Sequence, residues 1–382
     1  MVTNTIITPL HVAKEFLIAL ENNMVMGGLV YRRYSSEFQS GRGATVVVKS
    51  PTSFTATAFT STVGASSITE GSVAVILDKH WDVTFELSSQ MLSTDIVSLS
   101  EETIQPAARA IAQAVDSDIC SRMATGIAGH YPVTSTPVVA DIANLSAVMD
   151  ILKVPMGDRR LVLHPATKAA YISLDSFLNA DKRGDGGQAL RKAEIGEVMG
   201  FNTYMDQNIP SQTRSFLLAN ATAAGTGTLT GAAAAGVTSC TVTGATAAAV
   251  STAPIGTPFK FTGYDQWYFM TAPCTAGTSG IATVTAFSPA VITAMADTSV
   301  VTFQLTGRDN IAFHKNALAF VTAPLALPVG GSKGEVVNYK GLSCRVVWSY
   351  NQTYKQNECS IDLLCGVKML NQNLAARLID KR

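Results

Sequence analysis

The chain has 382 residues, of which 47% are hydrophobic and 15% charged, and its 28 basic and 28 acidic side chains give a formal net charge of zero at pH 7. This length favours two or three domains, and the hydrophobic content excludes a chain that is disordered throughout. The neutral charge argues against a dedicated nucleic-acid binder, because such proteins carry a basic excess. No apolar run reaches the roughly 18 residues of a membrane span, and no signal peptide is visible, so we expect a soluble, cytosolic chain.

Two helices and a hairpin are expected in the first 130 residues. Residues 9–23 show the spacing of an amphipathic helix capped by Thr8. The strings "GRGATVVVKS" and "GSVAVILDKHWDVTFEL" predict strands, and the small polar residues between them predict the flexible tip of a long β-hairpin. A capping box at Ser98 and Glu101 predicts the start of a helix about 30 Å long. The expected buried faces of the two helices are Leu10, Ala13, Leu17 and Leu20, and Ile104, Ala108, Ile111, Val115, Ile119 and Met123.

Helices and strands alternate from Asp141 onward, as in an α+β domain. The strings "DIANLSAVMDILKVP" and "ATKAAYISLDSFLNA" predict helices, whereas "RRLVLHP" and "GEVMGFNTYMDQNIP" predict strands. This pattern stops near Ser211 and resumes at Asp309 with "DNIAFHKNALAFVTAPL" and "LSCRVVWSYNQTYKQNECSIDLLCGVKML". Two halves of one domain on either side of a different segment indicate an inserted domain.

The segment between the halves, residues 218–307, is nearly uncharged. It carries only Lys260, Asp265 and Asp297 and is rich in alanine, glycine and threonine. Strings such as "TLTG", "TVTG" and "TPFKFTGYDQWYFM" set β-branched and aromatic residues against glycine turns. Disordered segments are usually rich in charge and proline, so we expect a folded all-β insertion, a small barrel or sandwich.

The sequence contains no catalytic or cofactor-binding motif. The string "GTGTLTG" lacks the glycine spacing of a dinucleotide-binding loop, and no Walker, H-E-x-x-H or G-x-S-x-G sequence is present. We therefore expect no enzyme activity, no cofactor and no metal site.

The cysteines and histidines stand apart in the sequence and favour structural roles. Without a C-x-x-C pair, the cysteines are expected to be buried thiols and not disulfides or metal ligands. They are Cys120, Cys240, Cys274, Cys344, Cys359 and Cys365. The histidines are His11, His80, His130, His164 and His314. His164 and His314 are expected at element ends, where a histidine commonly bonds backbone groups.

Residues 179–192, "NADKRGDGGQALRK", predict a polar loop. Its Arg-Gly-Asp string matches an adhesion tripeptide, but such common residues arise by chance and a flexible loop explains them better. The basic side chains could contact phosphate or a neighbouring subunit, and a solvated loop face is the alternative. The candidates for contacts between subunits are Lys182, Arg183, Asp185, Arg191 and Lys192, together with Lys49 and Lys79 in or near the hairpin.

The order of these elements resembles the major capsid proteins of tailed double-stranded DNA bacteriophages. "WDVTFELSSQMLSTDIVSLSEETIQPAARAIAQAVDSDI" is similar to the family's hairpin strand that runs into its spine helix. "RRLVLHPATKAAYISLDSF", a glycine-rich loop and "AEIGEVMGFNTYMDQNIP" resemble its strand, helix, loop and G-E-x-x-G-F passage, and "SIDLLCGVKMLNQNLAARL" resembles its closing strands. The insertion resembles the extra β-barrel of podovirus coat proteins, although its low charge departs from them.

The resemblance implies the α+β fold of tailed-phage major capsid proteins, in six parts. These are an N-terminal arm (1–38), an extended hairpin (39–88), a peripheral domain with the spine helix (89–140), the first half of an axial domain (141–217), an inserted β-barrel-like domain (218–307), and the second half of the axial and peripheral domains with the C-terminal strand (308–382). The arm and hairpin would lie across neighbouring copies, and the loop at 179–192 would make axial contacts.

The resemblance also implies a structural protein that self-assembles through hexameric and pentameric capsomers into an icosahedral shell around double-stranded DNA. Expected partners are scaffolding protein and portal during assembly, a decoration protein in some shells, and DNA through non-specific contacts, with no membrane. The expected place is the virion capsid, assembled in the host cytoplasm. One alternative is an encapsulin-like nanocompartment shell, which would lack the insertion and need a cargo enzyme. Others are an enzyme, for which a reactive site is missing, and a β-rich adhesin, for which a signal peptide is missing.

Overall fold

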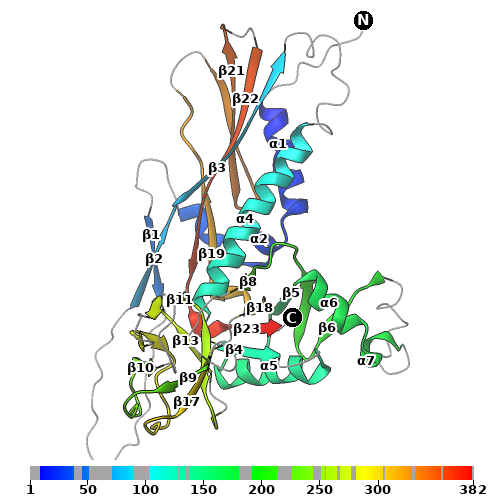
Figure 1. Cartoon of the computed structure of the whole chain (residues 1–382). Helices are drawn as coiled ribbons and strands as arrows, with labels where there is room; N and C mark the ends of the chain where they lie inside the picture. Colours follow the sequence, from blue (N-terminus) through cyan, green and yellow to red (C-terminus); the bar gives the residue numbers. More distant parts are fainter. Residues whose placement is uncertain are drawn as a thin grey trace, which may run out of the picture. The chain divides into compact units, whose positions relative to one another are not determined.

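The structure is a computed structural model that describes residues 9–37, 45–50, 71–88, 103–127, 129–133, 137–179, 192–213, 226–243, 251–253, 255–264, 267–276, 281–303, 306–328, 332–353 and 356–380. The chain forms two compact units, residues 1–116 with 318–370, and residues 117–317 with 371–382. The described strands form four sheets, and helices cover parts of them (Figure 1). The predicted α+β class is confirmed.

The first unit is built on a five-stranded antiparallel sheet. Its strands, in spatial order, are β19 (Leu318–Ala323), β22 (Gln356–Met369), β21 (Leu342–Asn351) and β20 (Lys333–Tyr339), with β3 (Lys79–Ser88) also paired to β22. Helix α1 (Pro9–Asn23) packs against β20 and β21, and α2 (Met26–Leu29) and the 3-10 turn η1 (Arg33–Glu37) follow it. The buried face of α1 contains the predicted Ala13, Leu17 and Leu20, but Leu10 is 40% exposed, so that part of the prediction is wrong.

The predicted hairpin is present as a separate two-stranded sheet. Strand β1 (Thr45–Ser50) pairs antiparallel with β2 (Gly71–Ile76), and the predicted flexible tip lies outside the described residues. The string predicted as one long second strand is divided at Leu77 and Asp78, and β3 pairs with β22 instead of β1. The division lets Val48 and Val75 pack against β19 while β3 joins the larger sheet.

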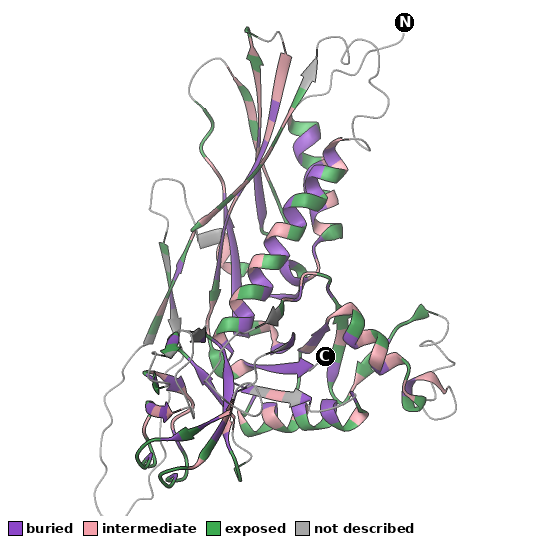
Figure 2. Ribbon diagram, viewed as in Figure 1, coloured by how far each residue is buried: buried purple, intermediate pink, exposed green. Residues whose placement is uncertain are grey.

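Helix α4 (Gln105–Gly126) begins in the first unit and ends in the second. All six residues predicted for the buried face are buried, five of them within α4 and Ile104 directly before it, and Figure 2 shows buried positions recurring along one side of the helix. The predicted capping box at Ser98 and Glu101 lies outside the described residues. The 3.6-residue period was therefore sufficient to find both the helix and its packing face.

The second unit contains a seven-stranded mixed sheet. Its order is β4 (Gly129–Val133), β23 (Ala375–Asp380), β18 (Thr306–His314), β5 (Arg159–Leu163), β7 (Phe201–Met205) and β6 (Glu197–Val198), with β8 (Ser211–Thr213) paired to β18. Helix α5 (Val139–Ile151) packs on β4 and β23, and α6 (Pro165–Ile172) and α7 (Asp175–Leu178) replace the single helix that was predicted. Strands from before and after the low-charge segment lie side by side, which confirms that this segment interrupts one sheet.

The interrupting segment forms its own nine-stranded antiparallel sheet. In spatial order its strands are β11 (Ser251–Ala253), β14 (Cys274–Ala276), β15 (Ile281–Val284), β10 (Cys240–Thr243), β9 (Thr226–Leu229), β17 (Val300–Phe303), β12 (Pro258–Phe261), β13 (Trp267–Met270) and β16 (Phe287–Ser288). Among the described residues, its core consists of side chains of the segment itself, around the ring of Phe259. The all-β insertion is confirmed, and its closure into a barrel stays a prediction.

Candidate functional site

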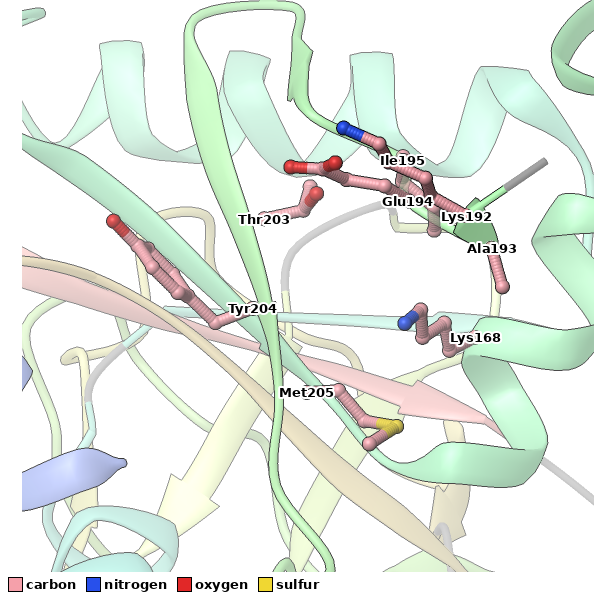
Figure 3. A pocket seen from close by; sticks show the side chains of 8 residues that line it. All are labelled: Lys168, Lys192, Ala193, Glu194, Ile195, Thr203, Tyr204 and Met205. Atoms are coloured by element: carbon pink, nitrogen blue, oxygen red, sulfur yellow. The ribbon is translucent and has the colours of Figure 1, made fainter. Parts of the chain in front are cut away.

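A pocket in the second unit contains one predicted contact residue, Lys192. Its volume is about 380 Å³. Figure 3 shows residues 192–195 along its upper rim, Met205 of β7 along its lower rim and the Lys168 side chain of α6 between them. Strand β6 pairs with β7 only at Asn202 and Phe201, so the edge of β7 from Thr203 onward borders this pocket. The pocket thus combines two lysines and Glu194 with the apolar side chains of Ile195 and Met205.

The other predicted contact residues are not brought to this pocket. Lys182, Arg183, Asp185 and Arg191 lie outside the described residues. Lys49 belongs to β1, and Lys79 is the first residue of β3, both in the first unit. The structure therefore places only Lys192 at a hollow surface.

A second candidate surface is the segment of residues 150–158, called the α5 loop below, which consists of the last two residues of α5 and the loop that follows them. Arg159, 2% exposed, fixes this loop by donating from Nε to the carbonyl oxygen of Pro155 at 2.9 Å and from Nη2 to Asp150 Oδ1 at 2.7 Å. The same Nη2 donates to the carbonyl oxygen of Val154. The loop nevertheless leaves Ile151 79% exposed and Met156 75% exposed. Two apolar side chains are thus held in water by a loop whose backbone is already fixed.

A third candidate surface is the outer face of the hairpin. In the register of β1 and β2, Val48 and Val75 point to the buried face, whereas Val47 and Ile76 lie on the other and are 59% and 51% exposed. Each of these strands pairs only with the other among the described residues. An isolated two-stranded sheet is marginally stable, so an apolar outer face with two open edges is suited to packing against another chain.

The second unit also holds buried ion pairs that the sequence analysis missed. Arg377 Nη1 lies 3.7 Å from Asp309 Oδ2, and Arg308 Nη1 donates to Asp380 Oδ2 at 3.3 Å. Thr167 donates to the same Asp380 oxygen at 3.0 Å. Charged residues inside the apolar strings "GRDNIAF" and "AARLID" were the available signal, because a charge within a buried strand needs a partner.

His164, His314 and the six cysteines have the structural roles expected of them. His164 Nδ1 accepts from the backbone N–H of Ala166 at 3.2 Å, and His314 Nδ1 accepts from that of Asn316 at 3.3 Å. Burial lowers the pKa of both histidines, which keeps them neutral. All six cysteines are buried thiols outside disulfides, and burial raises the pKa of Cys240 and of Cys359 to about 12, so these thiols are poor nucleophiles.

The described residues contain no group of three or more His, Cys, Asp or Glu side chains that could hold a metal ion. In the same part of the chain, no helix has the length and apolar character needed to cross a membrane.

Comparisons with known proteins agree with the resemblance seen in the sequence. The family model described as "P22 coat protein - gene protein 5" matches residues 1–287. No curated protein matches significantly. A solved structure from Mycobacterium phage Che8 has a TM-score of 0.52 at 14% identity and covers 93% of this chain and 90% of its own. The capsid structure of the cyanophage P-SCSP1u has a TM-score of 0.52 at 12% identity, over 94% and 88%. At these identities the two structures show a shared fold.

Proposed function

Because the chain belongs to the P22 coat protein family and is a phage capsid shell protein, we propose that its copies assemble through hexameric and pentameric capsomers into an icosahedral shell around double-stranded DNA. Its role in the virion is structural. Assembly takes place in the host cytoplasm, with scaffolding protein and portal as partners and a decoration protein in the finished shell. The six-part division of the chain is part of this proposal, supported by the separate pairing of strands β9–β17.

The observation that carries the proposal is the α5 loop, which Arg159 fixes. Exposed apolar side chains are common singly, but Ile151 and Met156 are each at least three-quarters exposed on one short loop. Because Arg159 already holds the loop backbone, little conformational entropy is lost when a partner covers these side chains. In a shell of identical subunits, that partner is a neighbouring copy.

Two further surfaces would contribute to the same shell. The outer face of the hairpin, with Val47 and Ile76, would pack on an adjacent copy, and the pocket beside Lys192 would receive side chains of a capsomer neighbour. Lys182, Arg183, Asp185 and Arg191 remain candidates for the same axial contact, and Lys49 and Lys79 for contacts of the hairpin. Contact with DNA would be non-specific and weak, because the chain has no net positive charge to displace counterions.

The test is a double variant, Ile151→Gln with Met156→Gln, co-expressed with the scaffolding protein of the same phage. Covering one such side chain is worth roughly 1.5–3 kcal/mol, which is about tenfold or more in an association constant. We therefore expect a soluble subunit with wild-type thermal unfolding and far fewer closed particles, measured by sedimentation velocity and negative-stain microscopy.

The matched control is Ile292→Gln, which removes an apolar side chain of the inserted segment that is 66% exposed. This variant should form particles as the wild type does. Wild-type particle yield from the double variant would exclude the α5 loop as a contact surface. A wild-type chain that stays monomeric with its scaffolding protein would contradict assembly itself.

A further inference from the structure

Arg377, in β23, joins three parts of the second unit that are far apart in the sequence. Its side chain is wholly buried. Nη2 donates to the carbonyl oxygen of Gly256 at 2.8 Å, and Nη1 donates to the carbonyl oxygen of Ala124. The same Nη1 lies 3.7 Å from the carboxylate of Asp309, which is also wholly buried. One guanidinium thus connects the inserted strands, the end of α4 and the seven-stranded sheet.

The contact with Ala124 uses a property of helix ends. Ala124 belongs to the last turn of α4, where carbonyl oxygens have no donor within the helix. The positive charge of Arg377 also lies at the negative end of the helix dipole. Arg377 therefore donates a hydrogen bond to a buried carbonyl oxygen that would otherwise need a water molecule as its partner.

The turn at Gly256 fits directly against this helix end. Gly256 has a φ of +81°, and a Cβ atom there would lie 3.0 Å from the Ala124 oxygen and 3.2 Å from Thr125 Cα. Two backbone hydrogen bonds connect the turn to β13 of the inserted sheet. The Gly256 N–H donates to the Met270 carbonyl oxygen at 2.8 Å, and the Met270 N–H donates to the Thr257 carbonyl oxygen at 3.1 Å. Only glycine allows both this backbone conformation and this close approach.

We propose that Arg377 is a positioning residue for assembly that fixes the inserted strands β9–β17 to the end of α4, so that helix and insertion move as one body. The chain enters and leaves the insertion through residues 214–225 and 304–305, and Arg377 adds a non-covalent connection. A lysine could not replace it, because two carbonyl groups on different segments are bridged by the planar fork of a guanidinium. The effect of this contact on shell assembly rests on the proposed function, because it concerns how the insertion is oriented toward neighbouring subunits.

The test uses the full chain as an unassembled subunit and compares Arg377→Lys with wild type by hydrogen–deuterium exchange. We expect exchange to rise roughly tenfold at residues 123–127 and 255–257, while β10, β15 and β18 keep their protection. The contact of Arg377 and Gly256 with the end of α4 is called the Arg377 joint below. Gly256→Ala tests this joint without changing the buried charges, in case the lysine variant fails to fold. Gly263→Ala is the matched control, because Gly263 has a φ of +91° but no neighbour within 4 Å of a Cβ.

In particles, Arg377→Lys and Gly256→Ala should give shells of mixed size or blurred density for the insertion, whereas Gly263→Ala should give wild-type shells. Unchanged exchange at both sides of the joint in folded variants would overturn the joint. Raised exchange with uniform wild-type shells would confirm the joint but overturn its role in positioning. Failure of the wild type to assemble would contradict the proposed function and leave the exchange result standing.

Discussion

At the residue scale, the ion pair of Glu21 and Arg32 shows how the first unit holds its N-terminal helix. Arg32 donates from Nη1 and Nη2 to the two carboxylate oxygens of Glu21, at 2.8 and 3.1 Å. Lys340 lies 3.9 Å from the same carboxylate, in the turn between β20 and β21. The hydrogen bonds from Arg32, aided by the charges of Arg32 and Lys340, lower the pKa of Glu21 although burial opposes this. The carboxylate therefore connects α1 to the segment after α2 and to a turn of the sheet.

This pair predicts a pH-dependent part of the stability. Because the pKa of Glu21 is lower in the folded chain than its ordinary value of 4.5, the ionised form stabilises the fold above that value, and the contribution is lost as the pH falls through the folded-state pKa. The difference in free energy of unfolding between wild type and Glu21→Gln should be constant from pH 7 to about pH 5 and shrink as the pH falls below 4.5. Urea unfolding at a series of pH values measures it. A difference that stays unchanged as the pH falls well below 4.5 would refute the assignment.

Residues differed in how well the sequence predicted them. The capping histidines were predicted because their partners lie two residues away. Arg377 was missed because its partners, Ala124 and Gly256, are 253 and 121 residues distant. Local patterns report local bonds, whereas a buried ion pair depends on which strands become neighbours. Asp309 and Arg377 could have been flagged as unusual, but their pairing required the sheet order.

At the element scale, the division of one predicted helix into α6 and α7 has a packing reason. Tyr171 and Phe177 both belong to the core of the second unit. Side chains six residues apart on a continuous helix point in directions roughly 120° apart, so one helix would not turn both toward the same part of the core. The backbone leaves the helical conformation at Leu174, which has a ψ of 138°, and this break turns Phe177 toward the same core as Tyr171. Tertiary packing thus overrode a continuous helical pattern.

The attachment of the hairpin gives a second prediction. A Cβ atom on Gly366 of β22 would overlap the carbonyl oxygen of Ile76 and lie 3.1 Å from Leu77 Cα. Gly366→Ala should therefore displace the end of β2 from β22 and destabilise the first unit by roughly 1–3 kcal/mol, with faster proteolysis within residues 45–76. Gly28→Ala is the control, because a Cβ there meets no atom within 4 Å. Thermal unfolding and limited proteolysis measure both variants, and equal behaviour of the two would show that β2 does not need this close approach.

At the scale of the whole molecule, the inserted segment is chemically distinct but structurally complete. Its three charged residues among positions 218–307 set it apart from the rest of the chain, and this low charge predicted a folded insertion. The structure gives the physical reason, since the apolar residues form one core that contains Phe259, Phe261, Tyr268, Phe287 and Phe303. The strand order could not be predicted, because short strands with similar Thr, Ala and Gly content leave many registers equally plausible.

A core that consists, among the described residues, of side chains of the segment itself predicts that residues 218–307 fold without the rest of the chain. The ring centroid of Phe259 lies 5.3 Å from that of Phe287 and 5.5 Å from that of Phe303, so this side chain packs β12 against residues of both β16 and β17. Phe259→Ala should lower the free energy of unfolding of the isolated segment by roughly 3–5 kcal/mol. Ile281→Ala, at a half-exposed position of β15, should change it by less than about 1 kcal/mol. Urea unfolding followed by tryptophan fluorescence measures both, because Trp267 is the one tryptophan of the segment. A gradual, non-cooperative transition in the unmutated segment would mean that the insertion depends on the joint at Arg377 for its fold as well as for its position.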